Sequence, residues 1–164
     1  MFKIKFLDGS EKEFDTLKGA NLIGADLSGV DLSGVDLSGS NCTGVNFRGA
    51  DLRGVNLIWA NCTGANFRGA NLSGVDLRRA DLRGADSSGV DFSGVDLRFC
   101  IGNQKEIKNL EGYIYHVTIW RDVIAIDFHQ HTKKEWLSFT EDEIFEMVGQ
   151  SDYMDSILAE ASDL

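Results

Sequence analysis

The chain has 164 residues, enough for one domain or for a repeat array with one small appendage. Its 26 acidic and 16 basic side chains give a formal net charge of −10, which argues against a protein that binds nucleic acid by neutralising phosphates. The apolar stretches are too short for a membrane span, and the first is interrupted at Asp8, so we expect neither a membrane span nor a secretory signal. Three widely spaced cysteines make no disulfide framework, which favours a cytoplasmic location.

Residues 1–18 predict a β-hairpin that caps the segment after it. Two short stretches of apolar and polar residues flank an Asp-Gly turn, a common hairpin turn. A three-residue loop would place Ile4 opposite Phe14 and Lys5 opposite Glu13, giving one apolar pair and one ion pair. The alternative is that one strand of this hairpin is an edge that binds a partner.

The next part of the chain is periodic: residues 19–98 divide into 16 uninterrupted blocks of five. Gly opens 14 blocks, Trp59 and Arg79 open the other two, and Ala or Val takes the second place in all but the block of Ser40. The third place is always Asp or Asn, and the fourth is Leu, Phe or Cys except at Ser87. A period of five matches neither a helix nor a flat strand, so the pattern predicts a solenoid.

A longer period of four blocks overlies the first. The tetrapeptide Asn-Cys-Thr-Gly occurs twice, four blocks apart, and each copy is followed by Asn-Phe-Arg-Gly-Ala. If four blocks make one coil, Cys42 should lie under Cys62 and Phe47 under Phe67 in neighbouring coils. We interpret the cysteines as stacked thiols rather than as a disulfide.

The blocks resemble the pentapeptide-repeat family, whose consensus is A(D/N)LXX, over about half of the chain. The resemblance implies a mainly β fold: a right-handed quadrilateral β-helix of about four coils, with second- and fourth-place side chains pointing inward. So narrow a core leaves no room for a substrate pocket, so we expect a non-enzymatic protein that binds a protein partner, with no catalytic residue and no cofactor. The fourth-place side chains expected in this core are Leu22, Leu27, Leu32, Leu37, Cys42, Phe47, Leu52, Leu57, Cys62, Phe67, Leu72, Leu77, Leu82, Phe92 and Leu97.

After the solenoid, assigned to residues 19–100, residues 101–164 predict a small α/β appendage. The segments Tyr113–Trp120 and Val123–Gln130 are predicted to pair as a hairpin, with Phe128 on its apolar face.

Three helices are expected in the appendage. Thr132 and Thr140 each precede a Glu by three residues, which is the capping-box spacing, so short helices should begin after each threonine. A last helix is expected over Tyr153–Ala161. Its apolar face, which could bury itself in a homodimer, consists of Met154, Ile157 and Leu158.

The segment Ile119–Met147, with its IWRD, HQHTKKEW and EDEI elements, resembles a tail found on some bacterial and phage pentapeptide-repeat proteins. The typical tail has Gly-Cys where this chain has Asp127 and Phe128. The resemblance implies roles in capping and dimerisation.

Three histidines are the only metal candidates in the sequence. His116, His129 and His131 could lie on the outward face of the predicted hairpin, with His116 opposite Asp127, and these are residue types that bind zinc. The alternative is that they form surface hydrogen bonds and pack against Trp120 or Trp136.

Charge is distributed unevenly along the chain. Residues 99–164 carry 13 acidic and five basic side chains, whereas residues 19–98 carry nine Asp and seven Arg. In the first coil the carboxylates have no basic neighbour, and later an apolar pair interrupts the polar exterior. The candidate interaction residues are therefore Asp26, Asp31, Asp36, Ile58 and Trp59. For Ile58 and Trp59 the alternative is a contact with the terminal segment folding back onto the solenoid.

A second function remains open because the best-known activity in the family is DNA mimicry. The quinolone-resistance members resemble duplex DNA and engage type II topoisomerases, so the resemblance implies an inhibitor or protector of gyrase or of another DNA-binding enzyme as the alternative. A mimic needs a continuous anionic surface. The short rod and the arginines of its later coils argue against this alternative.

Overall fold

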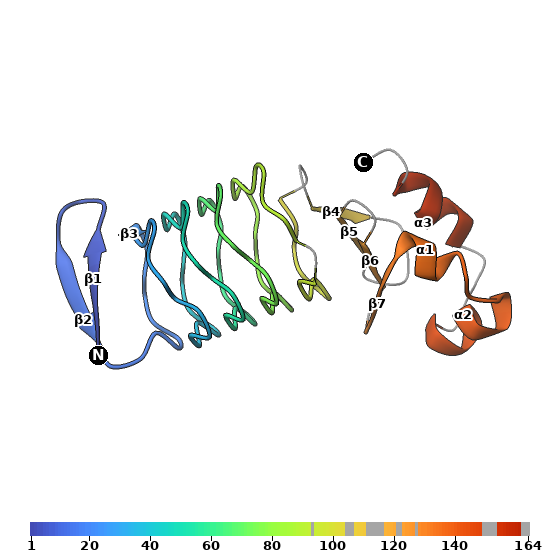
Figure 1. Ribbon diagram of the computed structural model, residues 1–164, viewed down its shortest axis with the longest axis horizontal. Coiled ribbons are helices and arrows are strands. Elements are labelled where there is room, and N and C mark those ends of the chain that lie inside the picture. The colour runs from blue at the N-terminus through green and yellow to red at the C-terminus, as the bar shows by residue number, and fades with distance from the viewer. Residues whose placement is uncertain are drawn as a thin grey trace.

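The five-residue blocks wind the backbone into a stack of coils that advances along one axis (Figure 1). The structure is a computed structural model of the chain. Parallel bridges join residues four blocks apart, as in the column Asp36, Asn56, Asp76 and Asp96. The structure describes residues 1–92, 94–103, 107–110, 117–120, 123–126, 128–148 and 154–161.

Each block folds by the same short-range hydrogen bonds. The third-place side chain accepts the backbone N–H two residues later, as Asp31 Oδ1 does from Ser33 at 2.9 Å. The turn that follows needs a positive φ, which Gly adopts without steric conflict, and Gly39 has a φ of 65°. Side-chain acceptor and glycine together therefore set the corner between one block and the next.

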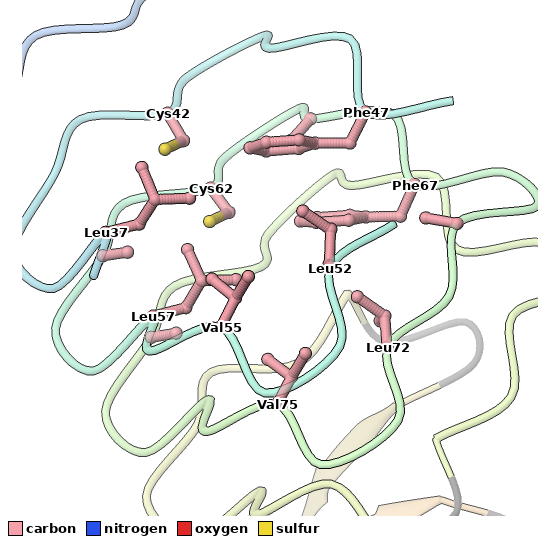
Figure 2. Packing of buried hydrophobic residues seen from close by; sticks show 14 of the residues in the cluster. Leu37, Cys42, Phe47, Leu52, Val55, Leu57, Cys62, Phe67, Leu72 and Val75 are labelled. Carbon is pink, nitrogen blue, oxygen red and sulfur yellow. The ribbon is translucent and has the colours of Figure 1, made fainter. Parts of the chain in front are cut away.

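Side chains from all coils fill the interior of the stack. The 15 fourth-place residues expected in the core are each at most 2% exposed. Figure 2 shows Cys42 beside Cys62 and Phe47 beside Phe67 from successive coils, and the two phenyl rings stack with centroids 5.1 Å apart. The cysteines are free thiols. Stacking of like residues thus follows directly from the four-block period.

The N-terminal hairpin consists of β1 (Phe2–Phe6) and β2 (Glu11–Phe14), and β1 also pairs with β3 (Ala25–Asp26) in the first coil. The predicted register is wrong by two residues, because Phe2 rather than Ile4 lies opposite Phe14.

Turn chemistry explains the shift. The loop is Leu7-Asp8-Gly9, closed by a 2.8 Å bond from Phe6 N–H to Ser10 O. Asp8 Oδ1 accepts the Ser10 N–H at 2.9 Å, and Gly9 takes a φ of 86°. Glu13 accordingly pairs with Lys3 instead of Lys5.

The appendage is a second antiparallel sheet covered by short helices, in the strand order β4-β5-β6-β7. No helix within the described ranges is both long and apolar enough to cross a membrane. The elements are β4 (Lys108–Leu110), β5 (Val117–Trp120), β6 (Val123–Ile126), β7 (His129–Thr132), α1 (Lys133–Trp136), α2 (Glu141–Val148) and α3 (Met154–Glu160).

The predicted strand Val123–Gln130 is wrong beyond Ile126. The chain reverses there, and β7 returns along β6 with Ile126 opposite His129. Phe128 therefore sits in a turn and is 67% exposed instead of lying on the apolar face. Tyr113–His116, predicted to begin the hairpin, lie outside the described residues, as do Arg121, Asp122 and Asp127.

Two capping boxes begin helices in the appendage, which confirms that prediction. Thr132 Oγ1 accepts from Glu135 N–H at 3.2 Å, and the Glu135 carboxylate accepts from Thr132 N–H at 2.7 Å. Thr140 and Glu143 repeat the arrangement. Helices α1 and α2 accordingly start directly after the two threonines.

The apolar face of α3 lies inside the appendage. Met154 and Ile157 are 5% and 1% exposed, in one cluster with Trp136, and Leu158 packs partly buried against it. The face that was expected to meet a second copy is therefore covered within the chain, and dimerisation itself stays a prediction.

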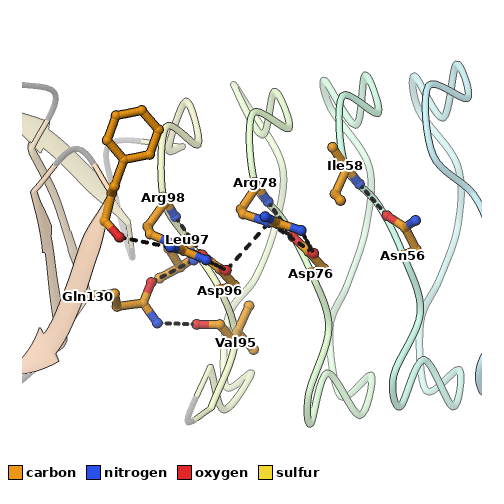
Figure 3. A network of polar contacts seen from close by, with 10 residues as sticks. Asn56, Ile58, Asp76, Arg78, Val95, Asp96, Leu97, Arg98 and Gln130 are labelled. Carbon is orange, nitrogen blue, oxygen red and sulfur yellow. Dashed lines mark hydrogen bonds and ion pairs between the residues drawn. The ribbon is translucent and has the colours of Figure 1, made fainter.

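One side-chain amide of the appendage continues the hydrogen-bond ladder of the solenoid. Gln130 Nε2 donates to Val95 O at 2.6 Å, and Gln130 Oε1 accepts from Leu97 N–H at 2.7 Å (Figure 3). One coil earlier, the backbone N–H and C=O of Asp96 make the equivalent bonds to Val75 O and Leu77 N–H. The Gln130 amide thus replaces a peptide unit of the next coil and pairs backbone that would otherwise be open.

We predict that Gln130→Ala lowers the free energy of unfolding by about 2 kcal/mol, because two backbone groups lose their partners. Urea denaturation followed by circular dichroism measures the change. Lys134→Ala, on the exposed side of α1, should leave the free energy of unfolding unchanged. Equal stability of wild type and Gln130→Ala would contradict this account of the junction.

Candidate functional site

One corner of the solenoid departs from the glycine rule. Trp59, Arg79 and Phe99 have φ values of 59°, 60° and 58°, and they are the only non-glycine residues with positive φ in the described part of the chain. They stand four blocks apart, so they occupy the same corner of successive coils, in the column that Gly39 occupies earlier. Each side chain there carries a backbone penalty on the order of 1–2 kcal/mol.

These side chains stack along the corner. The guanidinium carbon of Arg79 lies 4.8 Å from the ring centroid of Trp59 and 4.8 Å from that of Phe99. Phe128, from the turn between β6 and β7, continues the row. Its ring and that of Phe99 meet in a T-shaped arrangement with their centroids 5.0 Å apart. We call Trp59, Arg79, Phe99 and Phe128 the corner stack. It runs from the middle of the solenoid onto the appendage.

Figure 3 shows a row of polar groups whose arginines directly precede the corner residues in the chain, since Arg78 is followed by Arg79 and Arg98 by Phe99. Arg78 forms an ion pair with Asp76 at 2.6 Å and a longer one with Asp96 at 3.5 Å. Arg98 pairs with Asp96 and donates to Phe128 O at 2.8 Å. Burial acts to raise the pKa of Asp96, but hydrogen bonds from Arg98 and its charge hold that pKa below the usual value. Both arginines are thus matched by carboxylates.

Arg79 differs from these two arginines. It is exposed, and the ion pairs of the described residues do not include it. Its guanidinium carbon lies over the rings of Trp59 and Phe99, one coil before and one coil after it. These contacts hold the charge in place without using the N–H donors of the guanidinium.

A surface hollow of about 240 Å³ opens beside the corner stack. Its rim includes the two most exposed aromatic residues of the region, because Trp59 is 63% and Phe128 67% exposed. The hollow is lined by Ile58, Trp59, Arg78, Arg79, Arg98, Phe99 and Phe128. Two of the predicted interaction residues, Ile58 and Trp59, therefore lie at this hollow. Three arginines that the sequence pattern did not indicate as interaction residues lie there with them.

The other predicted interaction residues lie apart from the hollow. Asp26 and Asp31 each accept the backbone N–H two residues later and belong to other columns. Asp36 does have a basic neighbour, since Lys18 Nζ lies 3.5 Å away from just before the solenoid, which corrects the expectation. Hydrogen bonds from Ser38, with the charge of Lys18, lower the pKa of Asp36.

The histidines do not form a metal site among the residues that the structure describes. His116 lies outside those residues. His131 packs edge-on against Trp136 and Phe139, each with ring centroids 5.0 Å away. His129 is half-buried at the other end of β7. For His131 the structure agrees with the packing alternative.

All three cysteines are fully buried, although hydrogen bonds with Cys62 and Ser40 lower the pKa of the Cys42 thiol. Cys100 is fully buried, and burial raises the pKa of its thiol far above the usual range. A thiol that stays protonated is a poor nucleophile. The corner stack and its hollow are thus the strongest candidate site on the described surface.

We predict that Trp59→Gly changes the free energy of unfolding by less than about 1 kcal/mol. Relief of the positive φ and loss of the cation–π contact are similar in size and opposite in sign. Thermal and urea denaturation measure the difference. Trp120→Gly is the matched control: Trp120 is 3% exposed, so its loss should destabilise by about 3 kcal/mol or more. A loss above about 2 kcal/mol for Trp59→Gly would show that the stack is chiefly structural.

Comparison with known proteins bears on the solenoid. The profile of pentapeptide repeats matches in eight copies, over residues 16–54, 31–61 and 60–98. HetL, a pentapeptide repeat protein involved in heterocyst differentiation regulation from Nostoc sp. strain PCC 7120, is 31% identical over 52% of this chain, with a TM-score of 0.31. This match spans 38% of HetL.

Two further solved structures show the same kind of likeness. The pentapeptide repeat protein alr5209 from Nostoc PCC 7120 is 30% identical, over 48% of this chain and 81% of its own, with a TM-score of 0.36. QnrB1, a plasmid-mediated fluoroquinolone resistance protein, is 21% identical over 52% of this chain and 65% of its own, with a TM-score of 0.36. No curated protein matches the chain.

Proposed function

The chain belongs to the pentapeptide-repeat family, and on that premise we propose that it is a non-enzymatic protein that binds a protein partner through the corner stack. The inward side chains fill the solenoid, so contacts with other molecules are left to its outer surface. Arginine and aromatic side chains around a hollow are the composition typical of binding hot spots.

The observation that carries the proposal is the backbone of the corner stack. Glycine fits the positive φ at this corner, and Gly39 occupies the same place one coil earlier. Trp59 and Arg79 adopt that φ at a cost and yet are largely exposed, so the contact between their own side chains, and not burial, offsets that cost. Backbone strain held beneath exposed side chains is characteristic of a functional surface.

The proposal also includes two expectations from the sequence, namely the detailed geometry of the solenoid and the cytoplasmic location of the protein. The solenoid is taken as a right-handed quadrilateral β-helix of about four coils, with the β1–β2 hairpin as its N-terminal cap. Support comes from the bridges between residues four blocks apart and from the pairing of β1 with β3. The three free cysteines support a reducing, cytoplasmic location.

We predict that a variant with glycine at all three corner positions, Trp59→Gly, Arg79→Gly and Phe99→Gly, folds normally and loses its partner. Wild type and variant, immobilised at equal density, are exposed to lysate of the source cells. Mass spectrometry should identify a protein retained by the wild type and depleted at least about tenfold on the variant.

Arg53→Gln is the control, since it removes an exposed arginine of another column and should retain the partner. Equal retention of the same protein by wild type and triple-glycine variant would contradict a role for the corner stack.

DNA mimicry is the competing proposal, and the acidic first coil supports it. Hydrogen bonds within their blocks lower the pKa values of Asp26, Asp31 and Asp36, so all three stay ionised. In later coils Arg53, Arg83 and others pair with the carboxylate two residues earlier, which interrupts the anionic surface. A protein partner at the corner stack is therefore the better supported function.

For this competing proposal we expect a negative result. The full-length protein at micromolar concentration should leave DNA supercoiling by gyrase and drug-stabilised DNA cleavage unchanged. The two activities are read on agarose gels against a reaction without the protein. Inhibition of supercoiling, or protection from the drug, would favour DNA mimicry and contradict our choice.

A further inference from the structure

We propose that the corner stack recognises a single carboxylate side chain, Asp or Glu, flanked by apolar residues in an extended segment of the partner protein. The inference rests on the proposed function and adds the chemistry of the partner. Arg79 binds the carboxylate with its N–H edge, and Trp59 and Ile58 cover the neighbouring apolar side chains.

The balance of charge around the hollow indicates one carboxylate. Three arginines line it, and Asp76 and Asp96 are paired with two of them. Arg79 remains as one cation without an ion pair among the described residues. A planar guanidinium suits a carboxylate because the two form parallel hydrogen bonds.

The rest of the chain disfavours a run of acidic residues in the partner. The protein carries a net charge of −10, and the carboxylates of Asp76 and Asp96 are paired with two of the arginines that line the hollow. At physiological salt, repulsion from charges farther away than roughly 8–10 Å is largely screened. A single carboxylate of the partner in contact with Arg79 is therefore attracted to the guanidinium in spite of the negative net charge. Each further acidic residue would meet Asp76 or Asp96 instead of a free cation.

The apolar part of the inference comes from the end of the stack. Arg79 covers one face of the Trp59 indole, and the next member of the column on the other side is Gly39, which has no side chain to cover the second face. Ile58 lies next to Trp59 and is half-buried. An apolar side chain of the partner can therefore pack on the indole while the carboxylate reaches Arg79.

The chain contains its own reporter for a binding experiment. Trp59 is 63% exposed, whereas Trp120 and Trp136 are 3% and 0% exposed, so acrylamide quenching reports chiefly on Trp59. The probe is a short end-blocked peptide with one Glu between Leu and Phe, compared with the same peptide carrying Gln and with one carrying four consecutive Glu residues. The full-length protein is titrated with each.

We expect the single-Glu peptide to protect Trp59 from quenching with saturation, and the Gln and multiple-Glu peptides to bind at least about tenfold more weakly. Arg79→Gln should abolish the preference for Glu over Gln, and Arg79→Lys should weaken it, because an ammonium lacks the planar donors. The control Arg53→Gln should bind as the wild type does. A purely structural role of Arg79 would alter stability without altering the preference.

Three results would overturn the inference. The first is equal binding of the Glu and Gln peptides to the wild type, and the second is a preference for Glu over Gln that survives in Arg79→Gln. The third is concentration-dependent self-association that Trp59→Gly abolishes, which would assign the surface to a second copy of the chain. If no peptide binds but the triple-glycine variant still loses its partner, the interaction surface stands and the carboxylate is wrong. If that variant also keeps its partner, both proposals fail.

Discussion

The return of the backbone after every fourth block is the constraint on which the rest of this structure depends. It places the partners of one set of backbone hydrogen bonds one coil apart, as in the bond from Leu57 N–H to Asp76 O. It also places like side chains about 4.8 Å apart, the spacing of neighbouring strands. The stacked rings of Phe47 and Phe67 in the core and the corner stack outside follow from the same repeat.

The same constraint also fixes the spacing of side chains on the outer surface of the solenoid. Arg79 lies between two rings because Trp59 and Phe99 occupy the same corner one coil before and one coil after it, within cation–π range. The appendage continues this regular arrangement. The Gln130 amide pairs with the last coil, and the turn that follows β6 adds Phe128 to the corner stack. A binding surface of this kind is preorganised, so little conformational entropy is lost when a partner binds.

The period of five and the four-block period could be read from the sequence, and they predicted the family, the buried fourth-place side chains and the stacking of Phe47 on Phe67. The same periods contained the signal for Trp59 above Arg79, because both replace a corner glycine and stand four blocks apart. Phe128 could not be predicted, since its place depends on a chain reversal after Ile126 that leaves no local signal. The hairpin register failed because Asp8 and Ser10 fixed a loop one residue earlier than expected.

Solution NMR of the Arg79 side chain tests the central claim most directly, namely that the four-block return brings Trp59, Arg79 and Phe99 into one stack. Two aromatic rings over the guanidinium should shift the Arg79 δ-methylene protons upfield, with nuclear Overhauser contacts to both rings. In Trp59→Gly the upfield shift should decrease but not vanish, because Phe99 remains. Random-coil shifts for these protons in the wild type, without contacts to either ring, would contradict the account.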